Sequence, residues 1–249
     1  IREETLFQMS DMTLTTSVAG QEIKGKISMV GSGLDETEIL ASDANGSTRV
    51  RIRILRETVE TTTVMAGQTQ TESERDPLSG HTIIGAKVAG KWSFTMEKGE
   101  PSADQLTALR AFAAGYDEDR FLYPSDNTSI GQSWTIPENY FVRVFGTDDI
   151  ELSSASGEAT LKDIVDYKGS RHALIAMTLK FEGREKESDL NVTFSVSGQY
   201  YRDLTQYVDV DADLKGNATY SGIVTQQGMK IQMQMAGPVT MSYSQRVLP

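Results

Sequence analysis

Apolar and polar residues alternate with a period of two along much of the 249-residue chain. The clearest runs place the apolar residues of one segment on a single parity, and these are Ala173, Ile175, Met177, Leu179 and Phe181, followed by Leu190, Val192, Phe194 and Val196. Such alternation predicts β-strands with one face toward a core and the other toward water. Burial on one side only is typical of antiparallel sheets.

Short segments with glycine separate these runs and predict hairpin turns, because glycine adopts the positive φ that tight hairpins require. In the first half they occupy residues 18–21, 45–46, 65–68 and 88–91, and in the second half residues 167–170, 181–184, 196–199, 214–217 and 226–229. This spacing predicts a meander of roughly seven or eight strands between Asp148 and Leu248. Residues 47–68 and 170–199 share an outline, which leaves an internal duplication open.

One segment has a helical period instead. The apolar stripe of this segment consists of Leu106, Leu109, Phe112 and Ala113. Ser102 and Gln105 have the spacing of a capping box, and Gly115 supplies a stop signal, so we expect a helix over Ala103–Ala114.

Together these patterns predict an all-β fold with one main α-helix. Long antiparallel meander strands would form either one curved sheet or two packed half-barrels. We expect an N-terminal β half over residues 1–115 that ends in the helix, a connection over 116–147, and a C-terminal meander half over 148–249. One continuous domain is the alternative.

Methionines gather near the C-terminus, in the stretch GMKIQMQMAGPVTMSYSQ. Its apolar residues have one parity on two expected strands that meet at Gly237-Pro238, and they are Met229, Ile231, Met233, Met235, Met241 and Tyr243. A Cu(I) site is disfavoured because no His or Cys is near in sequence. Core packing stays open, and so does a wall that contacts an apolar ligand, since methionine adapts to irregular shapes.

Composition removes several classes of function. The net charge is −11, with 24 Lys and Arg against 35 Asp and Glu, which argues against nucleic acid as a partner. The chain has no cysteine, so thiol catalysis and cysteine-ligated metals are excluded. No stretch is apolar for long enough to predict a transmembrane helix. The chain starts at Ile1 and not at Met, which suggests that a leader segment has been removed.

Other candidate motifs are more simply explained as structure. Asp209, Asp211 and Asp213 resemble the start of an EF-hand loop, but Leu214 and Tyr220 stand where the loop needs Gly and Glu, so we expect a strand with an acidic outer face. A second set of residues alternates with apolar neighbours and should pair with glutamates across the strands. This set is Arg49, Arg51 and Arg53.

The remaining polar candidates also lack a catalytic context. The two histidines, His81 and His172, are expected to be structural, because no G-x-S-x-G elbow accompanies them. Asp117, Glu118, Asp119 and Asp126 predict a solvated acidic loop within residues 116–129.

Three short stretches resemble a pattern in uncharacterised exported bacterial proteins, many of which are lipoproteins. They are DPLSG at residues 76–80, GKW at 90–92 and GQSWTIP at 131–137. The resemblance implies a periplasmic or extracellular location, with possible anchoring through a removed N-terminal segment. The meander is also similar in style to the curved sheets of lipoprotein-carrier proteins, which wrap around a helix or an acyl chain.

These observations lead to three hypotheses about function. The first is a non-enzymatic cell-envelope protein whose methionine-rich sheet face contacts a lipid, another apolar ligand or a protein partner. The second is a structural or assembly protein with a closed core and no ligand. The third is a hydrolase that uses loop carboxylates. None of them calls for a cofactor or a metal ion.

Overall fold

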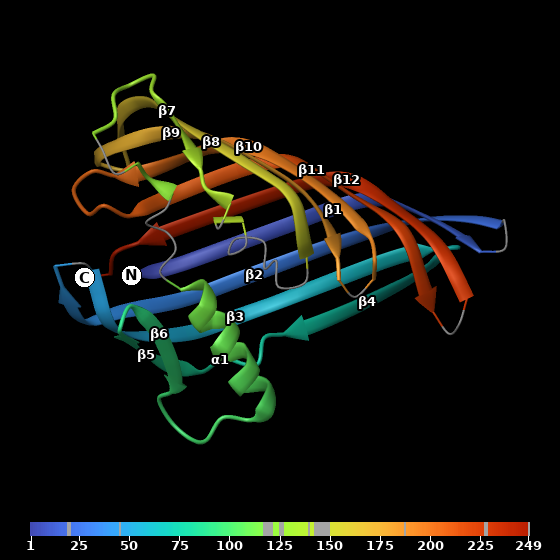
Figure 1. Cartoon of the computed structure of the whole chain (residues 1–249), viewed down its shortest axis with the longest axis horizontal. Helices are drawn as coiled ribbons and strands as arrows, with labels where there is room; N and C mark the ends of the chain where they lie inside the picture. Colours follow the sequence, from blue (N-terminus) through green and yellow to red (C-terminus); the bar gives the residue numbers. More distant parts are fainter. Residues whose placement is uncertain are drawn as a thin grey trace.

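One large antiparallel sheet organises the chain in the computed structural model (Figure 1). The structure describes residues 1–18, 21–44, 46–116, 122–124, 127–138, 140–141, 150–186, 188–226 and 229–248. Across these residues, twelve strands pair in the order β6-β5-β3-β2-β1-β12-β11-β10-β9-β8-β7, and β4 pairs with the outer half of β3. The sheet is open and curved, so of the two predicted arrangements the single curved sheet is confirmed.

The elements have the following bounds. The first half contains β1 (Arg2–Val18), β2 (Gln21–Asp43), β3 (Gly46–Met65), β4 (Gln68–Arg75), β5 (Thr82–Val88), β6 (Lys91–Met96) and α1 (Ala103–Gly115). The second half contains β7 (Ser133–Ile136), β8 (Ile150–Tyr167), β9 (Ser170–Glu185), β10 (Asn191–Asp203), β11 (Asp209–Gln226) and β12 (Met229–Arg246).

The first and last strands pair with each other in the middle of the sheet. Arg2 lies opposite Arg246, and the pairing of β1 with β12 continues to Ser17 opposite Gln232. The two ends of the chain therefore lie near each other (Figure 1). One sheet runs through both predicted halves, and the boundaries proposed for those halves stay a prediction.

Six predicted hairpins fall where one strand ends and the next begins. They are at residues 18–21, 45–46, 65–68, 88–91, 167–170 and 226–229. At residues 65–68, for example, Ala66 and Gly67 have φ values of 51° and 80°, which suits a two-residue turn that joins paired strands.

Three predicted turns are wrong, because residues 181–184, 196–199 and 214–217 lie inside β9, β10 and β11. Residues 150–246 consequently hold five long strands, β8 to β12, and not seven or eight shorter ones. Two of the glycines involved allow a close approach of neighbouring backbones. A Cβ on Gly198 would lie 1.9 Å from the carbonyl oxygen of Asp213, and a Cβ on Gly216 would lie 1.8 Å from that of Ser195.

The expected break at Gly237-Pro238 is also absent, and β12 passes through it as one strand. Opposite this point β1 has an irregularity: Met9 pairs with Val239, and the register resumes only at Thr13 with Ala236. Proline cannot donate a hydrogen bond to a neighbouring strand, so a bulge in the partner is a site where a sheet tolerates it.

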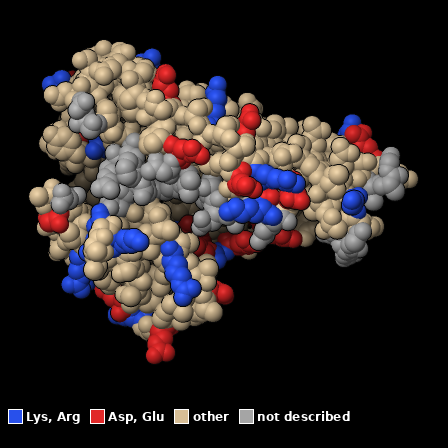
Figure 2. Space-filling model, viewed as in Figure 1, with Lys and Arg blue, Asp and Glu red and all other residues tan. Residues whose placement is uncertain are grey.

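Most of the buried apolar side chains of the sheet lie on one face, which we call the inner face because α1, Leu122, Tyr140 and Phe141 pack on it. Under α1, Leu109 packs with Val50 and Ile52 of β3 and with the aromatic residues of β6. At the other end, Leu122 and Phe141 pack with the inward residues of β8 to β12. Figure 2 shows these two covered ends as separate lobes, with side chains of both charges interspersed on them.

The helix forms where it was predicted. Ser102 Oγ accepts a hydrogen bond from the backbone N–H of Gln105, and the Gln105 side chain accepts one from the backbone N–H of Ser102, which confirms the capping box. The predicted apolar stripe is wrong at one position. Leu109 is 4% exposed and Phe112 packs against the core, but Leu106 is 41% exposed.

Leu109→Ala should lower the free energy of unfolding by about 2–5 kcal/mol, because it leaves a cavity between the helix and the sheet. Leu106→Ala, on the same helix, should change it by less than about 1 kcal/mol because the side chain is largely in solvent. Urea unfolding of both variants provides the measurement. Equal losses for the two would contradict the packing of α1 on β3 and β6.

Gly216→Ala should destabilise the protein by about 1–3 kcal/mol or more, because the methyl group cannot fit beside the backbone of β10. Gly31→Ala is the matched control, since a Cβ there would meet no atom closer than 3.8 Å. Thermal melts of the two variants should separate clearly. A stable Gly216→Ala protein would show that the two strands are further apart than described.

Candidate ligand-binding face

Beyond the two covers, toward the hairpins that join β1 to β2 and β11 to β12, apolar side chains of the inner face stay partly exposed. We call this set the open strip, and it consists of Ile23, Met29, Val59, Val224, Ile231 and Met233. These residues come from four strands, β3, β2, β12 and β11, and β1 lies between β2 and β12 as the floor of the strip. Strand register places them on one face, because inward residues lie opposite inward residues, as Ile231 does with Val224.

The floor of the open strip is covered by side chains from its own sheet. Leu14 of β1 is only 4% exposed, and Thr16 is buried as well. Leu14 lies opposite Met235 and Gly25, and Thr16 lies opposite Met233 and Ile23. Among the described elements, β1 makes its main contacts with β2 and β12, so the flanking side chains shield the floor.

The six residues predicted to form a ligand wall are distributed along β12. Met235, Met241 and Tyr243 are half-buried on the inner face, and the first two pack against the larger core. Ile231 and Met233 are half-buried in the open strip, whereas Met229, at the tip of the hairpin, is 52% exposed. Contact of this set with a ligand stays a prediction.

Two glycines hold successive inward positions of β2 beside the open strip. Gly31 lies between Phe7 of β1 and Val59 of β3, and Gly33 lies between Thr5 and Glu57. The Thr5 side chain covers Gly33, because a Cβ on this glycine would lie 2.5 Å from Thr5 Oγ1. A group of acidic residues follows these glycines along the inner face.

This group of acidic residues was missed from the sequence. Asp35 lies opposite Glu3 on one side and Ile54 on the other, so its carboxyl group faces inward. Glu57 faces the same way because the register skips Leu55 and thereby reverses the parity of β3. An unbroken alternation of inward and outward side chains along β3 would have placed Glu57 on the outer face. No local sequence signal marks the skipped residue.

The surroundings raise the pKa of both carboxyl groups, of which Asp35 is half-buried and Glu57 is exposed. Desolvation raises the pKa of Asp35 to about 6, although the terminal amine of Ile1 opposes the shift. Desolvation and the nearby negative charges of Asp76 and Asp35 raise the pKa of Glu57 to about 7. The inner face therefore gains negative charge at this place as the pH rises through neutrality.

A buried polar group at the β8–β9 turn serves the fold. The Nδ1 of His172 lies 2.9 Å from the carbonyl oxygen of Ser170, and its Nε2 lies 3.7 Å from Asp203 Oδ2. Asp203 accepts hydrogen bonds from the Ser170 hydroxyl and from the backbone N–H groups of Thr205 and Gln206. Because the serine donates to the aspartate and not to the histidine, the group lacks a nucleophile–base pair, as expected for a structural histidine.

A second polar group ties the segment that covers the core to the sheet. The hydroxyl of Tyr123 donates to Asp209, and Arg202 donates to the same carboxylate at 3.0 Å. The Arg202 guanidinium also lies 3.9 Å from the centre of the Tyr123 ring. The charges of Arg202 and Asp209 are therefore engaged in contacts within the fold.

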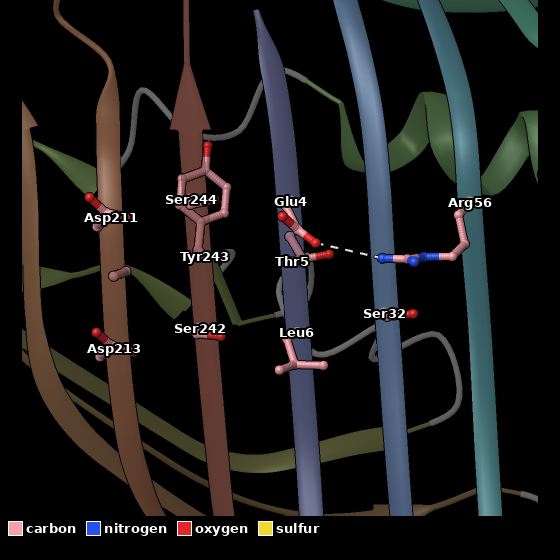
Figure 3. Close-up of a pocket in the computed structure, with 11 residues that line it drawn as sticks. Glu4, Thr5, Leu6, Ser32, Arg56, Asp211, Asp213, Ser242, Tyr243 and Ser244 are labelled. Atoms are coloured by element: carbon pink, nitrogen blue, oxygen red, sulfur yellow. Dashed lines mark ion pairs between the residues drawn. The ribbon is translucent and has the colours of Figure 1, made fainter.

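The outer face has a shallow polar groove over β3, β2, β1, β12 and β11 (Figure 3). Arg56 forms an ion pair with Glu4 at 3.6 Å across β2, and Asp211, on the far side, pairs with Lys168 at 2.5 Å. In Figure 3 α1 lies behind the strands, so this groove is on the face opposite the open strip. Its serines and paired charges give it the character of a solvated sheet surface.

The predicted pairing of arginines with glutamates is confirmed at two positions. Arg51 binds Glu38 at 2.6 Å and Glu97 at 2.9 Å, and Arg53 binds Glu36 at 3.0 Å. Asp209 and Asp211 lie on a strand, as expected.

Within the described ranges, no cluster of three or more His, Cys, Asp or Glu could hold a metal ion, and no helix is long and apolar enough to cross a membrane. The acidic loop residues Asp117, Glu118, Asp119 and Asp126 lie outside the described residues.

Comparison with known proteins adds little to this geometry. No protein-family model matches the chain, and no curated protein matches it. Among solved structures, the chain is similar to a DUF1329 family protein from Desulfovibrio piger ATCC 29098, at 9% identity over 98% of this chain and 83% of that chain, with a TM-score of 0.13. A TM-score this low carries no argument about fold or function, so the resemblance to exported lipoproteins stays a prediction.

Met233→Gln should cost about 0.5–2 kcal/mol of stability, because it places an amide without an arranged partner among half-buried apolar groups. Gln232→Met, at the neighbouring exposed position, should be neutral within about 0.5 kcal/mol. Chemical denaturation of both variants tests the assignment of faces. Equal effects would overturn it, because a shift of one residue exchanges the two faces of a strand.

Proposed function

We propose that this protein is a non-enzymatic binding protein that holds the acyl chain of a lipid, or a similar linear apolar molecule, on the open strip. The observation that carries the proposal is the set of apolar side chains left partly exposed beyond α1 and beyond Leu122 and Phe141, toward the β1–β2 and β11–β12 hairpins. A single curved sheet has to bury its apolar face, and in the described residues the two covers pack on its ends.

The shape of the open strip favours a chain-like ligand over a protein surface. Four of its six members are half-buried, and only Ile23 and Val59 are exposed. The strip gives way to inward threonines on β3, Thr61 and Thr63, beyond Val59. A stable protein interface buries about 800 Å² on each partner. A narrow set of apolar residues, with polar residues on one side and the core on the other, is better matched to the width of an alkyl chain.

The residues of the open strip also suit such a ligand chemically. Methionine is flexible and polarisable, so Met29 and Met233 can adjust to different chain shapes. Binding would require no catalytic group, and the polar groups around His172 and Arg202 are engaged in the fold. The support for ligand binding is therefore an uncovered apolar area, while these polar groups already make their hydrogen bonds within the fold.

We further propose a cell-envelope location, on the basis of the resemblance of residues 76–80, 90–92 and 131–137 to exported proteins. Fractionation of the cells that make the full-length protein, followed by immunodetection, tests it. Recovery of the protein in the cytoplasmic fraction alone would contradict this location and leave ligand binding untouched.

Native mass spectrometry of protein purified without detergent should detect bound acylated molecules that solvent extraction removes. Delipidated protein should then bind the uncharged dye Nile red with one-to-one stoichiometry. Met233→Gln should weaken dye binding several-fold, and Gln232→Met should leave it unchanged. Native protein that carries no lipid and ignores the dye would favour the structural alternative, in which side chains close the inner face completely.

A further inference from the structure

Two hairpins of the central strands end together at the end of the sheet that lies away from the chain termini (Figure 1). Ser17 pairs with Glu22 on one side and with Gln232 on the other, which places the β1–β2 and β11–β12 turns at the same level. We call this part of the sheet the distal tip, and it consists of residues 14–18, 21–26, 222–226 and 229–233.

Apolar side chains are exposed on both faces of the distal tip. Ile223 lies opposite Gln232 on the outer face and is 54% exposed. On the inner face Val224 lies opposite Ile231, and Ile23 of β2 is exposed as well. A protein layer packs against one face of a sheet, whereas a lipid phase surrounds both faces of a hairpin that enters it. The exposure on two sides therefore favours a membrane over a flat protein surface as the partner.

Lysines accompany these apolar residues on the outer face. Lys24 and Lys26 of β2 and Lys230 of β12 are all exposed. Lys24 lies 3.6 Å from Glu22, and Lys26 lies 3.1 Å from Asp11. Exposed ion pairs of this kind are weak, so the phosphate groups of lipids can compete for both lysines.

The charge of the distal tip is opposite in sign to that of the whole protein. The tip has three lysines against one glutamate, whereas the chain as a whole has a net charge of −11. An anionic surface attracts the tip and repels the rest of the molecule, so the charge distribution orients the protein with the tip toward such a surface.

We propose that the distal tip docks on a bilayer that contains anionic lipids, with Ile23, Ile223 and Met229 among the acyl chains and the lysines at the headgroup phosphates. Lysine side chains are long enough to stay at the headgroups while their apolar neighbours lie deeper. The inference rests on the proposed function for its ligand. Four members of the open strip belong to the distal tip, so docking brings the strip to the lipid whose acyl chain it holds; they are Ile23, Val224, Ile231 and Met233.

Flotation of the protein with vesicles tests the docking. The wild type should float with vesicles of equal parts phosphatidylglycerol and phosphatidylcholine, and much less with vesicles of phosphatidylcholine alone. Raising the salt concentration from about 0.05 M to about 0.5 M should weaken the binding, because salt screens the attraction between lysines and phosphates. Equal binding to both kinds of vesicle would overturn the role of the lysines.

Charge variants locate the contact. Lys24→Gln/Lys230→Gln should weaken binding to the anionic vesicles roughly twentyfold, at about fivefold for each lysine. Lys91→Gln/Lys98→Gln is the matched control, because these two lysines are also exposed and lie on and just after β6, outside the distal tip. An equal loss in both double variants would overturn the assignment to the distal tip.

A matched pair of isoleucines tests the apolar contact. Ile223→Ser should weaken vesicle binding roughly fivefold, because it removes apolar area that the bilayer would bury. Ile39→Ser should leave binding unchanged, since Ile39 is 53% exposed but lies near the β2–β3 hairpin, at the opposite end of the sheet. If Ile223→Ser melts below the wild type, Ile223→Thr replaces it, because threonine keeps the branched side chain that suits a strand. Equal effects at positions 39 and 223 would contradict insertion of the tip.

Nile red binding without vesicles tests the proposed function separately. Protein that binds the dye and floats with neither kind of vesicle would overturn the membrane docking and leave the binding function standing. Protein that floats with anionic vesicles, carries no lipid and ignores the dye would overturn the binding function and leave the docking standing.

Discussion

The need to cover one apolar face of an open sheet governs this structure. Twelve strands in one layer present a continuous inner face, and a sheet of this kind is stable only when its apolar side packs against something. Leu109 of α1 supplies part of the cover at one end, and Leu122 and Phe141 supply it at the other. Beyond these covers, toward the β1–β2 and β11–β12 hairpins, the sheet relies on its own side chains, which is why Leu14 is buried while Met233 and Ile23 on the flanking strands are not.

Irregularities in the strands decide which residues this face presents. The bulge of β1 near Asp11 lies opposite Pro238 and allows β12 to continue as one long strand. The skipped register at Leu55 reverses the parity of β3, so that Ile54 and Glu57 both face inward. Gly198 and Gly216 bring β10 and β11 closer than any side chain would permit. The same devices that shape the sheet thus place a carboxyl group beside an apolar strip.

Polar groups in the molecule fall into two kinds with different consequences. Those around Asp203 and Asp209 are enclosed by hydrogen bonds and hold the turns and the covering segment to the sheet. Asp35 and Glu57 instead lie on the inner face of β2 and β3, where their surroundings raise their pKa values to about 6 and about 7.

The sequence by itself determined the β-rich class, six of the hairpins, the capped helix and the inward parity of Met233 and Met235. These features depend on residues within a few positions of one another, so the local pattern contains them. Tertiary structure decided the rest: β12 lies against β1, Leu106 faces solvent, Gly216 continues a strand, and Glu57 points inward. Each of these outcomes depends on which distant strand lies alongside and how closely its backbone approaches, and a period of two along one strand carries no information about its neighbour.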